Sequence, residues 1–122
     1  MTYWILENKL GTCAVGEEVP KGSIVHDVRY LVDGKNTPLN IWLTVVSVRK
    51  SLSSGNPIII QCQAGMSRSN AIAIMILCLR NNRSWEENEE FVRKKVPRTL
   101  IDLSLKDSCK KALRYGRKRK SS

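Results

Sequence analysis

Cys62 and Arg68 are the residues of this chain whose types and spacing could perform a reaction. Three isoleucines, Ile58–Ile60, come just before Cys62 and indicate a short buried strand, and the apolar run Asn70–Leu79 indicates a buried helix. A turn between such a strand and helix points backbone N–H groups and a helix N-terminus at one place, which then binds anions. The same positive field favours the anionic, nucleophilic form of a cysteine side chain.

The residues around Cys62 and Arg68 suit a bound phosphate. Their spacing of six lets the loop curl until the planar guanidinium faces two phosphate oxygens, and Gly65 allows a sharp turn close to a ligand. Ser69 can donate a hydrogen bond to the Cys62 sulfur. We therefore predict phosphoryl transfer through a cysteinyl-phosphate. The predicted phosphate-binding residues are Gln63, Ala64, Gly65, Met66, Ser67 and Arg68.

A proton donor is also needed, because the oxygen that leaves a phosphate ester must be protonated. Asp33 is the first candidate, since the pattern predicts that it ends the strand Ile24–Val32 and that Gly34 follows it in a loop. Asp27 is the alternative, although the pattern places it within the strand. We predict that Asp33 is the general acid.

The rest of the sequence predicts the elements that hold these residues. Thr37 and Pro38 are a typical N-cap and first residue of a helix. The other predicted strands and helices are Tyr3–Leu6, Leu10–Val15, Leu39–Leu52, Ser84–Lys95 and Leu103–Tyr115. Gly116 is predicted to end the last helix. With 122 residues, the chain is predicted to form one domain, 1–116, followed by a basic, disordered tail, 117–122.

Residues 62–69, Cys-Gln-Ala-Gly-Met-Ser-Arg-Ser, resemble the active-site loop of the cysteine-dependent protein tyrosine phosphatases, in the form typical of the dual-specificity branch. The resemblance extends from about Val25 to Leu105. It implies an α/β fold, with a central sheet of four or five largely parallel strands flanked by helices. It also implies a phosphatase that needs no metal and no cofactor and hydrolyses phosphotyrosine, phosphoserine and phosphothreonine in proteins. In such an enzyme Asp33 would be the general acid, and Ser69 would ease departure of the thiolate.

Two features of the sequence leave other functions open. The net charge is +10, and residues 61–122 carry fifteen Lys or Arg against six Asp or Glu. This asymmetry is typical of proteins that bind nucleic acid or another polyanion, and it would suit an RNA 5′-triphosphate or a phosphoinositide at the same loop. A solvated basic face is an equally simple interpretation. Gln61 stands where the family has histidine, so a weakly active phosphate-binding module is a third hypothesis.

Composition and cysteine spacing suggest a cellular compartment. No run reaches the ~18 apolar residues of a membrane span, and the first residues lack the pattern of a secretory signal. The cysteines lie far apart, without a Cys-x2-Cys pair, and this spacing predicts neither a zinc site nor a disulfide framework. They are Cys13, Cys62, Cys78 and Cys109. We expect a soluble protein of the cytoplasm, where thiols stay reduced.

Overall fold

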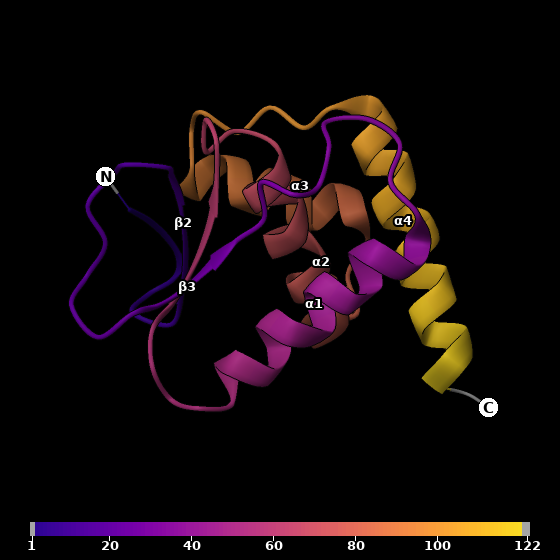
Figure 1. Cartoon of the computed structure of the whole chain (residues 1–122). Helices are drawn as coiled ribbons and strands as arrows, with labels where there is room; N and C mark the ends of the chain where they lie inside the picture. The colour runs from indigo at the N-terminus through magenta and orange to yellow at the C-terminus, as the bar shows by residue number, and fades with distance from the viewer. Residues whose placement is uncertain (1, 121–122) are drawn as a thin grey trace.

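The computed structural model describes residues 2–120, which form a four-stranded sheet with helices packed beside it (Figure 1). The elements are β1 (Tyr3–Leu6), β2 (Leu10–Ala14), β3 (Ile24–Asp27), α1 (Pro38–Leu52), β4 (Ile58–Cys62), α2 (Arg68–Asn81), α3 (Trp85–Lys95) and α4 (Leu103–Lys120). The strand order is β1-β2-β4-β3, with β2, β4 and β3 parallel and β1 antiparallel to β2. The predicted α/β domain with a largely parallel sheet is confirmed. None of these helices, as far as the chain is described, is long and apolar enough to cross a membrane.

The core is built around β4 and α2. Strand β4 lies between β2 and β3, and its three isoleucines are fully buried. Helix α2 is buried along most of its length and contacts the other three helices as well as β2 and β4. A strand and a helix that are apolar on all sides have to be enclosed in this way. This buried pair carries Cys62 at the end of β4 and Arg68 at the start of α2.

Strand β3 ends at Asp27 instead of continuing through the whole predicted strand. The Asp27 carboxylate accepts hydrogen bonds from the backbone N–H of Arg29 at 3.0 Å and from its guanidinium at 2.6 to 3.0 Å. The N–H of Leu31 donates to the oxygen of Val28 at 3.1 Å. These local bonds turn the chain away from the sheet. Asp33 therefore lies in a loop and not at the end of a strand.

Helix α4 continues through Gly116 to Lys120 instead of ending at the glycine. Gly116 is buried where α4 packs on α1, and a Cβ in its place would overlap the ring of Trp42. The glycine is therefore explained by close helix packing and not by a helix end. Residues 117–120 are helical, in contrast to the disordered tail that was predicted, and residues 121–122 of that tail lie outside the described residues.

Gly116→Ala is expected to lower the free energy of unfolding by about 1 to 3 kcal/mol, because the added methyl group must displace the Trp42 ring. Denaturant unfolding measures this change. Gly34→Ala is the matched control, since the nearest atom to a Cβ there is 3.9 Å away, and its effect should stay below about 0.5 kcal/mol. Equal effects at the two glycines would show that Gly116 is not a packing position.

Candidate active site

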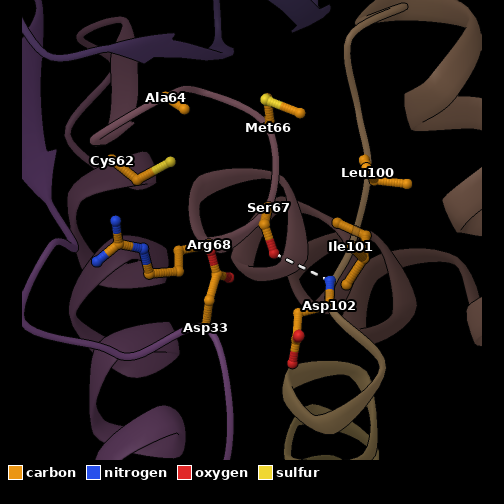
Figure 2. Close-up of a pocket in the computed structure, with 9 residues that line it drawn as sticks. All are labelled: Asp33, Cys62, Ala64, Met66, Ser67, Arg68, Leu100, Ile101 and Asp102. Carbon is orange, nitrogen blue, oxygen red and sulfur yellow. Dashed lines mark hydrogen bonds between the residues drawn. The ribbon is translucent and has the colours of Figure 1, made fainter.

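The loop between β4 and α2 borders a pocket of about 270 Å³ at the carboxyl edge of the sheet. The pocket is lined by Asp33, Cys62, Ala64, Met66, Ser67, Arg68, Leu100, Ile101 and Asp102. In Figure 2 the Cys62 sulfur and the Asp33 carboxyl point into the space between the loops, and the Arg68 guanidinium lies to the left, below Cys62. Three segments that are far apart in the sequence meet here: the loop after β3, residues 62–68 (the Cys62 loop) and residues 100–102.

The Cys62 loop has its backbone N–H groups available for a ligand. Gly65 has a φ of +66°, and the carbonyl oxygens of Gly65 and Met66 each accept a hydrogen bond from Asn70 Nδ2 at 3.0 Å. The N–H of Leu100 also donates to the Met66 oxygen at 3.0 Å. No hydrogen bond found between residues 2 and 120 uses an N–H of residues 63–68 as its donor. This series of N–H groups forms a cradle for an anion.

Arg68 is fixed by the loop that follows β3. Its Nη1 donates hydrogen bonds to the backbone oxygens of Arg29 and Leu31, at 2.9 Å each. Its Nε is buried and has no hydrogen-bond partner within the described part of the chain. One nitrogen of the guanidinium therefore holds the loop, while Nε remains for an anion. This arrangement suits a phosphate, whose oxygens match the fork of a guanidinium.

Cys62 and Ser69 are in direct contact. The Cys62 side chain is only 2% exposed, and its thiol donates to Ser69 Oγ, 3.2 Å from the sulfur. Ser69 is itself buried in the first turn of α2. When the cysteine is ionised, the hydrogen bond reverses and the serine hydroxyl donates to the sulfur. The predicted pair is thus brought together, and its catalytic roles remain predictions.

Three carboxyl groups lie at or near the pocket, and Asp33 is the best placed of them to give a proton. It lines the pocket, and no residue of the described chain hydrogen-bonds its carboxyl. Asp102 Oδ2 instead accepts from the N–H of Leu105 at 3.0 Å, at the start of α4. Asp27 does not line the pocket, and hydrogen bonds from Arg29 hold the pKa of its carboxyl below the ordinary value. Asp27 is therefore the poorer candidate for the acid, since it lies outside the pocket and its carboxylate form is stabilised.

The structure divides the predicted phosphate-binding residues into two groups. Ala64, Met66, Ser67 and Arg68 line the pocket, whereas the side chain of Gln63 is exposed and Gly65 provides the turn. Gln61, the departure from the family pattern, is the register partner of Asp27 and contributes, after Arg29, to lowering the pKa of its carboxyl. Gln61 is not among the residues that line the pocket.

An ion pair between Glu17 and Arg98 supports the Cys62 loop from outside the pocket, and sequence reasoning missed it. Arg98 donates to both carboxylate oxygens of Glu17, with Nη1 3.2 Å from Oε2, and the N–H of Ala14 donates to the same carboxylate. The guanidinium also lies 5.0 Å from the centre of the Tyr3 ring. A Cβ on Gly65 would collide with it, so the ion pair packs directly against the loop. No local pattern indicates this pair, because 81 residues separate its members.

Arg98→Met is expected to lower kcat/KM by about 10- to 100-fold, because the Cys62 loop loses a rigid support and its N–H groups move out of register with the phosphate. Steady-state kinetics and the affinity for inorganic phosphate measure this effect. Lys94→Met is the control, since Lys94 pairs with Glu90 at 3.9 Å on the exposed face of α3, and it should change activity less than about twofold. Equal losses in the two variants would contradict a positioning role for Arg98.

The Glu17–Arg98 pair also predicts a dependence of stability on acid. Hydrogen bonds from Arg98 lower the pKa of Glu17 from 4.5 to about 2. A carboxyl group with a lowered pKa stabilises the fold fully above its ordinary pKa and loses that contribution as the pH falls towards the lowered value. The difference in Tm between the unaltered chain and Glu17→Gln should therefore be constant above about pH 5 and shrink towards pH 2. A difference that does not change with pH would contradict this coupling.

Comparisons with known proteins agree with this architecture. No model of a known protein family matches the chain, and no curated protein does. A leucine-rich-repeat and phosphatase-domain protein from Entamoeba histolytica superposes with a TM-score of 0.77, at 13% identity over 99% of this chain and 96% of that one. A variant of human DUSP28 gives 0.76, at 11% identity over 97% of each chain. PTPMT1 superposes with a TM-score of 0.64 and 26% identity, and the match covers 74% of this chain and 57% of PTPMT1.

The sheet order, the Cys62 loop and the pocket at the carboxyl edge together define the architecture of the cysteine-based phosphatases. The chain shares this fold with structures of protein tyrosine phosphatases, small dual-specificity phosphatases among them.

Proposed function

We propose that this chain is a cysteine-dependent phosphatase that hydrolyses phosphotyrosine, and also phosphoserine and phosphothreonine, in proteins. The observation that carries the proposal is the meeting of three groups at one pocket: the Cys62 sulfur, the unpaired Nε of Arg68 and the Asp33 carboxyl. A nucleophile, an anion-binding guanidinium and an acid are the parts that transfer of a phosphoryl group to cysteine requires.

In the first step the Cys62 thiolate attacks phosphorus, an S–P bond forms, and the bond from phosphorus to the leaving oxygen breaks. Asp33 gives that oxygen its proton, so the alcohol or phenol leaves neutral. Arg68 and the N–H groups of residues 63–68 hold the remaining phosphate oxygens throughout. Their charge and dipoles stabilise the negative charge of the transferring group, which is preorganised electrostatic catalysis.

In the second step water attacks the cysteinyl-phosphate. Asp33, now ionised, takes a proton from the water while the S–P bond breaks and inorganic phosphate forms. Ser69 donates its hydrogen bond to the departing thiolate, from the place it already holds 3.2 Å away from the sulfur. The enzyme thereby returns to its starting state with Asp33 protonated.

The walls of the pocket support phosphotyrosine as the preferred substrate. Met66, Leu100 and Ile101 form an apolar side, and Asp33 with Arg68 forms a polar side. An aromatic leaving group can pack on the apolar side while its oxygen meets the acid. The apolar side is also open to solvent, since Leu100 is 63% exposed. A rim of this kind leaves room for the shorter side chains of phosphoserine and phosphothreonine.

The other substrates considered from the sequence receive less support. The charge asymmetry that would suit an RNA 5′-triphosphate comes largely from cations on the helices, whereas Arg68 is the single cation among the residues lining the pocket. A PTPMT1 structure in complex with PI(5)P also resembles this chain, with a TM-score of 0.66 and 20% identity. A phosphoinositide therefore belongs in any substrate comparison.

The test is a comparison of kcat/KM for a phosphotyrosine peptide, a phosphoserine peptide, PI(5)P in vesicles and a 5′-triphosphate RNA, all with a chelator present. The phosphotyrosine peptide should be the best substrate. A preference of more than about tenfold for the lipid or the RNA would overturn the proposed substrate class and leave the chemistry at Cys62 standing. Binding of phosphopeptide without turnover would favour the phosphate-binding module.

A further inference from the structure

Cations lie at or just after the C-terminal ends of α1 and α2 and along α4. In Figure 1, α1 ends at the lower left of the view and α4 at the lower right, whereas the Cys62 loop lies at the top. We call the surface that carries these cations the basic pole, and its residues are Arg49, Lys50, Arg80, Arg83, Lys110, Arg114, Arg117 and Lys118. Basic residues at a helix C-terminus are stabilised by the helix dipole. The dipole acts only within the last turn of a helix, so it does not account for the cations that lie further along α4.

Two hollows each bring some of these cations together from different parts of the chain. One, of about 220 Å³, lies between α1 and α2 and is flanked by Arg49 and Arg80. The other, of about 130 Å³, lies beside α4. Its cationic lining residues are Arg83, Lys110, Arg114 and Arg117. Each hollow therefore brings together guanidinium groups from segments that are distant in the sequence.

Much of this positive charge is not neutralised. Lys110 pairs with Glu86 at 2.9 Å, and Glu87 is used in the capping box of Ser84. Within the described chain, no ion pair involves Arg83 or Arg114. A surface with this excess of positive charge concentrates polyanions from solution.

The basic pole is too far from the pocket to bind the phosphate that is hydrolysed. Arg80 follows Arg68 by twelve residues of α2, and Arg114 follows Asp102 by twelve residues at α4. At 1.5 Å per residue, either path is about 18 Å long. The pole is therefore a separate surface, and a ligand bound there leaves the pocket open.

We propose that the basic pole binds the phosphate backbone of nucleic acid, without reading its sequence. A docking surface for a lipid bilayer would carry exposed apolar side chains among its cations. None of the large hydrophobic side chains exposed on the described chain is a residue of the pole, and Val46 of α1, one turn before Arg49, is the one that comes near it along a helix. Trp85, the aromatic residue in the second hollow, is buried and cannot stack on bases. Contacts to phosphate oxygens alone give affinity that depends on salt and not on sequence.

Fluorescence anisotropy with a labelled single-stranded RNA of about 20 nucleotides, at about 50 to 200 mM salt, tests this proposal on the full chain. The logarithm of the binding constant should fall linearly with the logarithm of the salt concentration. Arg83→Gln with Arg114→Gln removes two phosphate contacts, so the slope should become shallower by about 1.4. The conservative pair Arg83→Lys with Arg114→Lys should restore most of the binding.

Lys21→Gln with Lys95→Gln is the matched control, because it removes the same charge from exposed positions outside the pole, in the connection between β2 and β3 and at the end of α3, and its salt slope should equal that of the unaltered chain. Equal weakening by both glutamine pairs, or no RNA binding at low salt, would overturn the proposal. A competition with anionic phospholipid vesicles separates the two ligands. If the vesicles displace the RNA, and if they bind the Arg83 and Arg114 variants more weakly than the unaltered chain, the surface is assigned to membranes instead. Turnover of a small aryl phosphate reports separately on the pocket and should be unchanged in all these variants.

Discussion

Cys62→Ser is expected to lower phosphate release from a small aryl phosphate by at least about 10⁴-fold. The hydroxyl of serine is far less nucleophilic than a thiolate, and the cradle of the Cys62 loop does not provide a base to deprotonate it. Binding of the substrate should survive, since the N–H groups and Arg68 are untouched. The measurement is kcat with a chelator present, together with the affinity for inorganic phosphate.

Cys109→Ala is the matched control for this variant. Burial in α4 raises the pKa of the Cys109 thiol to about 12, so it carries no reactive thiolate. At temperatures where the variant is folded, its kcat should differ from that of the unaltered chain by less than about twofold. If Cys62→Ser keeps a substantial part of the activity, or if Cys109→Ala loses as much, the nucleophile has been assigned wrongly.

Asp33→Asn is expected to lower kcat by about 10²- to 10⁴-fold for a substrate whose leaving group is a poor one, such as phosphoserine. For an aryl phosphate with an acidic phenol the loss should be much smaller, because that oxygen departs without a proton. The dependence of kcat on the pKa of the leaving group should therefore become steeper in the variant. A series of aryl phosphates measures this slope directly.

Asp27→Asn separates the two candidate acids that the sequence left open. Asp27 is held by Arg29 outside the pocket, so its replacement should leave the leaving-group dependence unchanged. A steeper slope for Asp27→Asn than for Asp33→Asn would move the acid to Asp27. Equal losses with good and poor leaving groups in Asp33→Asn would mean that Asp33 has another role.

The parts of the fold that the sequence predicted well are those determined by local patterns. The buried run before Cys62 forms β4, and the capping box at Ser84 begins α3 as predicted. Thr37 accepts the N–H of Asn40 at 3.2 Å and caps α1. Strand, turn and cap signals extend over a few residues, so they can be recognised without knowledge of the tertiary structure.

The parts that sequence reasoning predicted wrongly or missed depend on contacts between distant segments. Gly116 has the pattern of a helix end, yet it is the point where α4 meets the Trp42 ring. The support of the Cys62 loop by Glu17 and Arg98 cannot be read from either residue, because each alone resembles an ordinary surface charge. Asp33 was placed at a strand end, and the hydrogen bonds of Arg29 move that end to Asp27.

Detection of phosphate on Cys62 itself tests the proposed chemistry most directly. Mixing the enzyme with excess aryl phosphate, quenching in acid within the first turnover and mapping peptides by mass spectrometry should show a phosphoryl group on Cys62. Cys62→Ser treated in the same way should show none there. Rapid turnover with no phosphoryl group on Cys62, or with phosphate on another residue, would contradict a cysteinyl-phosphate mechanism at this pocket.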